Sequence, residues 1–136
     1  MSEILTVIGL SNSLCEGKET DEEKVNAISD WITANIKYDK EVAEKMKTFQ
    51  GYSVYSSRTL DTKKGICIDF AFLFWDMLRR QNISAQIISG HFLGRTFIHA
   101  WNKVLLNDEW KLYDLTFKAG GYFVDPKNYV EDKVIK

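Results

Sequence analysis

Residues 67–80 constrain the fold of this chain more than any other segment. They read CIDFAFLFWDMLRR, and Phe70, Phe74 and Met77 recur at the three- and four-residue spacing of an α-helix. Because apolar side chains surround most of the circumference of this helix, other elements have to cover it on several sides. Two arginines close the segment, at the helix end where the dipole favours cations. We therefore expect a central, largely buried helix that ends near residue 80.

A second helix is predicted upstream, over residues 20–36. It begins with a capping box, in which the Thr20 side chain accepts a hydrogen bond from the backbone N–H of Glu23. Valine and isoleucine then recur at spacings of three and four, so one face of this helix should lie on the core. Residues 39–47 have only a short apolar edge and a weaker helical pattern, and residues 50–62 read as a long connection.

Downstream of the central helix the pattern changes to strands. Residues 85–89 and 97–106 read as two strands, and residues 110–117 read as a third. Asn107 and Asp108, which separate the last two, are typical of a two-residue hairpin turn. We expect an α+β fold in which N-terminal helices and the central helix pack on an antiparallel β-sheet.

The length of 136 residues fits one domain, so we expect residues 1–136 to form a single unit. The 18 basic and 19 acidic residues give a net charge of −1, which leaves no electrostatic case for nucleic-acid binding. No apolar run is long enough to span a membrane, and residues 1–10 lack the basic start of a signal peptide. We expect a soluble chain without a membrane partner, either cytoplasmic or cut from an exported protein. The oligomeric state stays open.

The chain has two cysteines, Cys15 and Cys67, too few for a disulfide framework and without the neighbouring Cys or His residues of a zinc site. No spacing is typical of a calcium or phosphate loop, so we expect no metal and no cofactor. Cys15 lies in a polar segment and is expected to be incidental. Cys67 opens the central helix, where unpaired N–H groups and the dipole favour a thiolate, and Gly65 would let the chain turn sharply into it. A small buried core residue is the alternative role for Cys67.

A nucleophilic cysteine needs a base, and His99 lies in the strand predicted for residues 97–106. With a two-residue turn, His99 pairs with Thr116, and Asp114 is its diagonal neighbour on the same face of the sheet. Asp114 would then hold the imidazole in one tautomer, which frees the other ring nitrogen to take the proton of Cys67. A turn of odd length without a bulge would place His99 and Asp114 on opposite faces, so this prediction depends on the turn.

Other candidate residues have plain structural alternatives. We expect His91 to be a loop or strand-end residue because no acid is placed to orient it, and Asp69 to be an acid favoured by the start of a helix. Trp101 shares a face with His99 and would wall a cleft, although tryptophans more often belong to the core. One oxyanion donor should be the backbone N–H of Cys67. The upstream candidates for the second donor or for substrate binding are Tyr38, Gln50, Tyr52 and Tyr55.

At these residues the chain resembles the transglutaminase-like superfamily of papain-fold cysteine enzymes, in its compact bacterial form. The matching motifs are GICIDFA at residues 65–71, HAWN at residues 99–102 and WKLYDLTF at residues 110–117. Matches at the end of the first helix and after the second extend the resemblance over a core of about residues 20–118, far more than a lone motif would cover.

The resemblance implies a papain-like core in which Cys67 is the nucleophile, His99 the base and Asp114 the orienting acid. The family often has proline after the acid, whereas this chain has Leu115, which changes backbone stiffness but no reacting group. Nothing in the chain resembles the additional β-domains or calcium sites of the animal crosslinking enzymes.

The activity that the resemblance implies is acyl transfer through a thioester. We expect a hydrolase, either a protease or peptidase or an amidase, that acts on peptide or side-chain amide bonds of a peptide or protein substrate. Two alternatives stay open: a protein-glutamine transamidase, and a non-catalytic peptide-binding module on the same fold.

Overall fold

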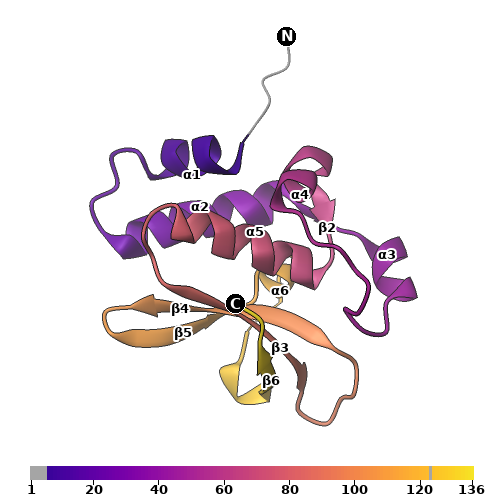
Figure 1. The fold of residues 1–136 in the computed structure, drawn as a ribbon. Helices are drawn as coiled ribbons and strands as arrows, with labels where there is room; N and C mark the ends of the chain where they lie inside the picture. Colours follow the sequence, from indigo (N-terminus) through magenta and orange to yellow (C-terminus); the bar gives the residue numbers. More distant parts are fainter. Residues whose placement is uncertain (1–5, 123) are drawn as a thin grey trace.

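The computed structural model describes residues 6–122 and 124–136. Helices cover one side of a four-stranded antiparallel sheet (Figure 1), so the α+β class expected from the sequence is confirmed. The helices are α1 (Val7–Cys15), α2 (Asp21–Asn35), α3 (Lys40–Lys45), α4 (Ser56–Thr62), α5 (Cys67–Arg79) and α6 (Leu115–Ala119), with a 3₁₀ turn at Pro126–Asn128. The strands are β1 (Lys37–Tyr38), β2 (Lys64–Gly65), β3 (Ala85–Phe92), β4 (His99–Leu106), β5 (Glu109–Tyr113) and β6 (Tyr129–Val134).

Helix α5 is the centre of the fold, as its apolar circumference predicts. It contacts α1, α2 and α4 on the helical side and β3 and β4 on the sheet side. Leu73, Phe74 and Met77 are fully buried. Burial of one such side chain contributes about 1.5 to 3 kcal/mol, so the helix is held in place by packing on both sides.

Helix α2 also forms where its sequence predicts. The Thr20 side chain accepts a hydrogen bond from the N–H of Glu23 at 3.1 Å and caps the helix. Val25, Ile28 and Ile32 are completely buried and form the face that meets α1 and α5. Among residues 6–122 and 124–136, none of the helices combines the length and the apolar character that crossing a membrane requires.

Three helices, α1, α4 and α6, are not predicted by the sequence pattern. Helix α1 begins where the Thr6 hydroxyl accepts from the N–H of Gly9, and the Ser11 hydroxyl ties it to the carbonyl of Met77 at 2.7 Å. Helix α4 lies in the segment that reads as a long connection, so that prediction was wrong for residues 56–62. Only two residues of α4 are buried, and so short an apolar pattern has no visible period.

The sheet has the strand order β5-β4-β3-β6. Asn107 and Asp108 adopt positive φ angles of 52° and 63° and pair Leu106 with Glu109, so the predicted hairpin turn is confirmed. The third predicted strand is too long, because β5 ends at Tyr113 and the chain turns into α6. Strand β6 lies in a tail for which the sequence predicts no element, and it pairs with the outer edge of β3.

Gly90 marks an irregularity in the β3–β6 pairing. The register shifts between Ser89 and Gly90, and a Cβ atom at Gly90 would lie 2.0 Å from the carbonyl oxygen of Val130 and 2.5 Å from the Trp101 ring. Only glycine fits between these two groups. The close approach lets the start of β6 lie beside Trp101, whose ring packs edge-on against Tyr129.

A small parallel pair, β1 with β2, joins the two halves of the helical layer. Lys37 pairs with Lys64 and Tyr38 with Gly65, and the N–H of Asp39 donates to the carbonyl of Gly65 at 2.9 Å. This pairing places the end of α2 beside the start of α5.

Candidate active site

Cys67 is the first residue of α5, as the sequence predicts. It is 9% exposed and lines a cleft between the helical layer and the sheet. The first N–H groups of a helix have no acceptor inside the helix, so they and the helix dipole favour negative charge at this position. The local setting of Cys67 therefore suits a thiolate.

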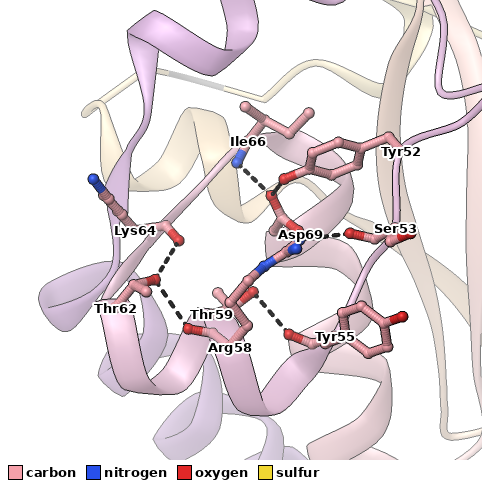
Figure 2. A network of polar contacts seen from close by, with 9 residues as sticks. All are labelled: Tyr52, Ser53, Tyr55, Arg58, Thr59, Thr62, Lys64, Ile66 and Asp69. Atoms are coloured by element: carbon pink, nitrogen blue, oxygen red, sulfur yellow. Dashed lines mark hydrogen bonds and ion pairs between the residues drawn. The ribbon is translucent and has the colours of Figure 1, made fainter.

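A buried carboxylate, Asp69, fixes the chain just before Cys67. Its Oδ2 atom accepts hydrogen bonds from the N–H of Ile66 at 2.9 Å and from the Tyr52 hydroxyl at 2.6 Å (Figure 2). The Arg58 guanidinium lies 3.7 Å from Oδ1. Burial, followed by this hydrogen bond, raises the pKa of Tyr52, so its hydroxyl remains a donor. The sequence interpretation of Asp69 as a simple helix-start acid is incomplete, since this carboxylate ties α5 to the segment before α4.

Glycine is required at position 65 for a different reason from the one inferred from the sequence. It lies in the short strand β2, and its φ angle is outside the left-handed region. A Cβ atom at Gly65 would lie only 2.6 Å from the Cβ of Asp69. Glycine is therefore needed for the close approach of Asp69 and not for a sharp turn.

His99 and Asp114 are in direct contact. The Nε2 atom of His99 lies 2.6 Å from Oδ2 of Asp114, and the two residues are 5% and 2% exposed. The predicted contact is present, but the predicted route to it was wrong: β5 ends at Tyr113, so His99 does not pair with Thr116. Asp114 instead follows the strand and caps α6, where its Oδ1 accepts from the N–H of Phe117 at 3.2 Å.

A third donor to Asp114 comes from Tyr129 at the start of β6. Its hydroxyl donates to Oδ2 of Asp114 at 2.7 Å, so it shares this oxygen with His99. Burial and the negative charge of Asp114 raise the pKa of Tyr129, which therefore stays a donor. Sequence reasoning missed Tyr129, because the contact depends on a strand pairing that no local pattern indicates.

Aromatic rings surround the imidazole of His99. Ring centroids lie at 4.8 Å for Phe92, 5.4 Å for Phe117, 6.0 Å for Trp101 and 6.4 Å for Tyr129. This burial alone would lower the pKa of His99. The hydrogen bond to Asp114 and the interaction with Cys67, together with the charges of both groups, outweigh burial and raise the pKa of His99 to about 9. Because Nε2 faces Asp114, Nδ1 is the ring nitrogen left for Cys67, which lines the same cleft, and the raised pKa favours the charged ring.

The cleft at these residues has a volume of about 990 Å³. The helical layer contributes the end of α2, β1 and α3, while the other side comes from the loop between β3 and β4, α6 and Tyr122. Cys67 and His99 both open into it. Tyr38 lines it as well, and burial and the charge of Cys67 raise the pKa of Tyr38.

The family model of the transglutaminase-like superfamily matches residues 8–115, which hold the cysteine, the histidine and the aspartate described above. The chain belongs to the transglutaminase-like superfamily. The match begins within α1, upstream of residue 20 where the sequence resemblance begins.

The relatives and solved structures agree with this family. The kyphoscoliosis peptidases of Mus musculus and Homo sapiens are each 32% identical over 121 residues, which cover 82% of this chain and 18% of theirs. A proposed cysteine protease from Cytophaga hutchinsonii is 24% identical with a TM-score of 0.67, over 92% of this chain and 40% of that one. The periplasmic domain of TgpA from Pseudomonas aeruginosa is 17% identical with a TM-score of 0.66, over 89% of this chain and 45% of that one. The transglutaminase-like, papain-like core expected from the sequence is confirmed, and the chain spans less than a fifth of the length of the two kyphoscoliosis peptidases.

The structure of this superfamily member does not bring three of the predicted site residues to the cleft. Trp101 is 1% exposed and packs edge-on against Tyr129 at 4.9 Å, so it supports the ring of His99 from the core. Tyr55 is 58% exposed on a separate groove beside α4, and Gln50 lies in an exposed turn. Of the upstream candidates, Tyr38 lines the cleft, whereas Tyr52 is committed to Asp69.

His91 and Cys15 both lie outside the cleft. His91 does have an acid beside it, since its Nδ1 lies 2.8 Å from Oδ2 of Asp132 on β6, and the inference that no acid is placed there was wrong. This pair is partly exposed and does not line the cleft. Cys15 is buried at the end of α1 within the hydrophobic core, where burial raises its pKa. Within residues 6–122 and 124–136, the His, Cys, Asp and Glu side chains form no cluster suited to a metal ion.

Proposed function

We propose that this chain is a cysteine-dependent hydrolase that cleaves peptide or side-chain amide bonds, with Cys67 as nucleophile, His99 as acid and base, and Asp114 as the orienting carboxylate. The observation that supports this most directly is the 2.6 Å contact between His99 and Asp114, in an imidazole that lines the same cleft as Cys67. The family and the names of the peptidase relatives support the same class of chemistry.

The reaction follows from these three groups. The Cys67 thiolate attacks the amide carbonyl, and the charged His99 gives its proton to the leaving amine as the C–N bond breaks. The product is a thioester on Cys67 and a free amine. Neutral His99 then takes a proton from water, which attacks the thioester, releases the carboxylic acid and restores the thiolate with its imidazolium.

The tetrahedral oxyanion needs donors at the start of α5. The backbone N–H of Cys67 is the first, because it opens the helix. Tyr38 is our candidate for the second, since it lines the cleft near Cys67 and its raised pKa keeps the hydroxyl protonated. Loss of one such donor typically lowers turnover about 100- to 1000-fold.

Alkylation with limiting iodoacetamide at neutral pH tests the nucleophile. We expect selective labelling of Cys67 over Cys15, mapped by mass spectrometry, and loss of that selectivity in His99→Ala. His91→Ala is the matched control, because it removes a histidine with its own aspartate outside the cleft. Equal, slow labelling of both cysteines in the wild type would favour the peptide-binding module and contradict the enzymatic proposal.

Products decide between hydrolysis and transfer to an amine. Peptides that contain glutamine are incubated with and without a primary amine, and the product masses are read, with Cys67→Ser as the inactive control. Addition of water in both conditions supports the hydrolase. Incorporation of the amine in its place would make the protein a transamidase that uses the same thioester.

A further inference from the structure

The helical side of the cleft carries a group of lysines. Lys37, Lys40 and Lys47 line it, from β1, from α3 and from the residues just after α3, and all three are exposed. Among the described residues, no aspartate or glutamate lines the cleft, and none of these lysines forms an ion pair with another described residue. Since the whole chain has a net charge of −1, this side of the cleft differs in charge from the molecule as a whole.

The positive surface continues beyond the cleft. A neighbouring groove shares Lys37 and Lys40 and adds Lys63 and Lys64, against the carboxylates of Asp39 and Glu41. One of these acids is already engaged, because Oδ1 of Asp39 accepts from the N–H of Val42. The lysines therefore dominate along the β1–β2 edge, next to the start of α5.

The other side of the cleft is aromatic. Phe97 and Tyr122 are 54% and 69% exposed, and Phe117 contacts both the ring of Tyr122 and the imidazole. Phe92 joins the group, with ring centroids 5.7 Å from Phe97 and 5.0 Å from Phe117. In Figure 1, α3 projects from the helical layer and the β3–β4 loop from the sheet on the same side of the molecule, so the lysines and the exposed rings come from different layers. Exposed rings that border a cleft are typical of a binding surface.

An extended peptide fits a cleft with lysines on one side and aromatic rings on the other, because its successive side chains point to opposite sides. We propose, on the basis of the function proposed above, that the cleft selects an acidic peptide in which carboxylate side chains alternate with large apolar ones. The carboxylates face Lys37, Lys40 and Lys47, and the apolar side chains face Phe97, Phe117 and Tyr122. The lysines also attract such a substrate at a distance, so binding weakens as salt is added.

Cysteine-directed peptide probes test this without knowledge of the natural substrate. Each probe is a peptidyl chloromethyl ketone with phenylalanine next to the reactive carbon. Glutamate, glutamine or lysine occupies the two positions that alternate with apolar residues further along the peptide. The rate of Cys67 modification is measured for each and divided by the iodoacetamide rate of the same variant. Because an exposed ion pair changes binding about two- to fivefold, the three lysines should favour the glutamate probe over the lysine probe by roughly tenfold or more.

Charge-reversal variants test whether the lysines of the cleft, and not other surface lysines, cause this preference. The variant Lys37→Glu, Lys40→Glu, Lys47→Glu should lose or invert the preference. The matched control is Lys18→Glu, Lys127→Glu, Lys133→Glu, which replaces three exposed lysines outside the cleft. It changes the net charge by the same amount and should keep the preference for the glutamate probe. Replacement of phenylalanine by serine in the glutamate probe should slow the wild type, and Phe97→Ser with Tyr122→Ser should reduce that difference.

The outcomes distinguish this inference from the proposed function. Equal rates with the glutamate, glutamine and lysine probes, or the same loss of preference in both charge-reversal variants, would overturn the acidic-peptide proposal alone, provided that iodoacetamide still labels Cys67 selectively and in a His99-dependent way. A wild type in which Cys67 shows no such selectivity would overturn the proposed function itself. A preference that disappears only with the cleft lysines supports both.

Discussion

Replacement of Asp114 by asparagine should reverse the tautomer of His99. The N–H of Phe117 donates to Oδ1 of Asp114, so the amide oxygen of asparagine has to occupy that position. The amide NH₂ then takes the place of Oδ2 and points its hydrogens at Nε2 of His99 and at Tyr129. A neutral imidazole can accept this bond only with its hydrogen on Nδ1, which leaves no acceptor for the proton of Cys67.

The structure gives the size of the effect. The pKa of His99 is raised from 6.5 to about 9, and at 1.36 kcal/mol per unit this difference corresponds to about 3 kcal/mol. Cys67 supplies part of it, so we expect Asp114→Asn to slow Cys67 alkylation at neutral pH about 10- to 100-fold. Turnover should fall further, by roughly 1000- to 10,000-fold, because the wrong tautomer also blocks the second half of the reaction.

The assay is the rate of Cys67 alkylation from mildly acidic to alkaline pH. The wild-type rate should be flat across neutral pH, where the raised pKa keeps His99 charged, whereas the Asp114→Asn rate should rise with pH. The matched control is Asp132→Asn, which alters the exposed carboxylate beside His91 and should leave the profile unchanged. If Asp114→Asn folds and reacts within about twofold of the wild type over this range, the geometry does not control the cysteine.

Three further predictions concern the support of the site. Tyr129→Phe leaves a carboxylate oxygen to His99 alone, so it should lower the free energy of unfolding in urea by about 1.5 to 3 kcal/mol and move the alkaline limit of turnover to higher pH; an unchanged limit contradicts this. Tyr52→Phe removes a 2.6 Å donor from the buried carboxylate of α5 and should slow Cys67 alkylation, whereas Tyr55→Phe, on an exposed ring, should not. In Cys67→Ser the contribution of Cys67 to the raised pKa of His99 is lost and that of Asp114 remains, so stability should be complete below pH 6.5 and fall as the pH rises toward about 9, by less than the roughly 3 kcal/mol of the wild-type shift; urea unfolding below pH 6.5 and at about pH 9 checks this, and equal stability refutes it.

Local signals in the sequence were sufficient for the elements that hold the nucleophile. The cap at Thr20 and the apolar circumference of α5 depend on neighbours within one or two turns, and both helices form where those signals predict. The turn at Asn107 and Asp108 is equally local, because both residues tolerate positive φ. These three features place Cys67 at a helix start and His99 on the strand next to β5.

Non-local contacts account for what the sequence did not predict. Alternation through Trp110 and Leu112 continues to Asp114, so the pattern extends the strand, whereas the Asp114 carboxylate ends it by capping α6. The position of β6 depends on the absence of a side chain at Gly90, 39 residues before Tyr129. A single chain pattern contains no sign that these two positions approach each other, so the third hydrogen bond to Asp114 could not be predicted.

The charge of His99 is therefore set by more than the three proposed reacting residues. Phe92 of β3, Phe117 of α6 and Tyr129 of β6 surround the ring, and Tyr129 also shares the oxygen that His99 uses. Two of these three residues, Phe117 and Tyr129, lie outside residues 8–115, the part that matches the family. Since burial lowers the pKa of His99 and the carboxylate raises it, a change in β6 alters both effects at once. A chain with the same cysteine, histidine and aspartate but a different edge strand should therefore keep the reaction and change the pH at which it operates.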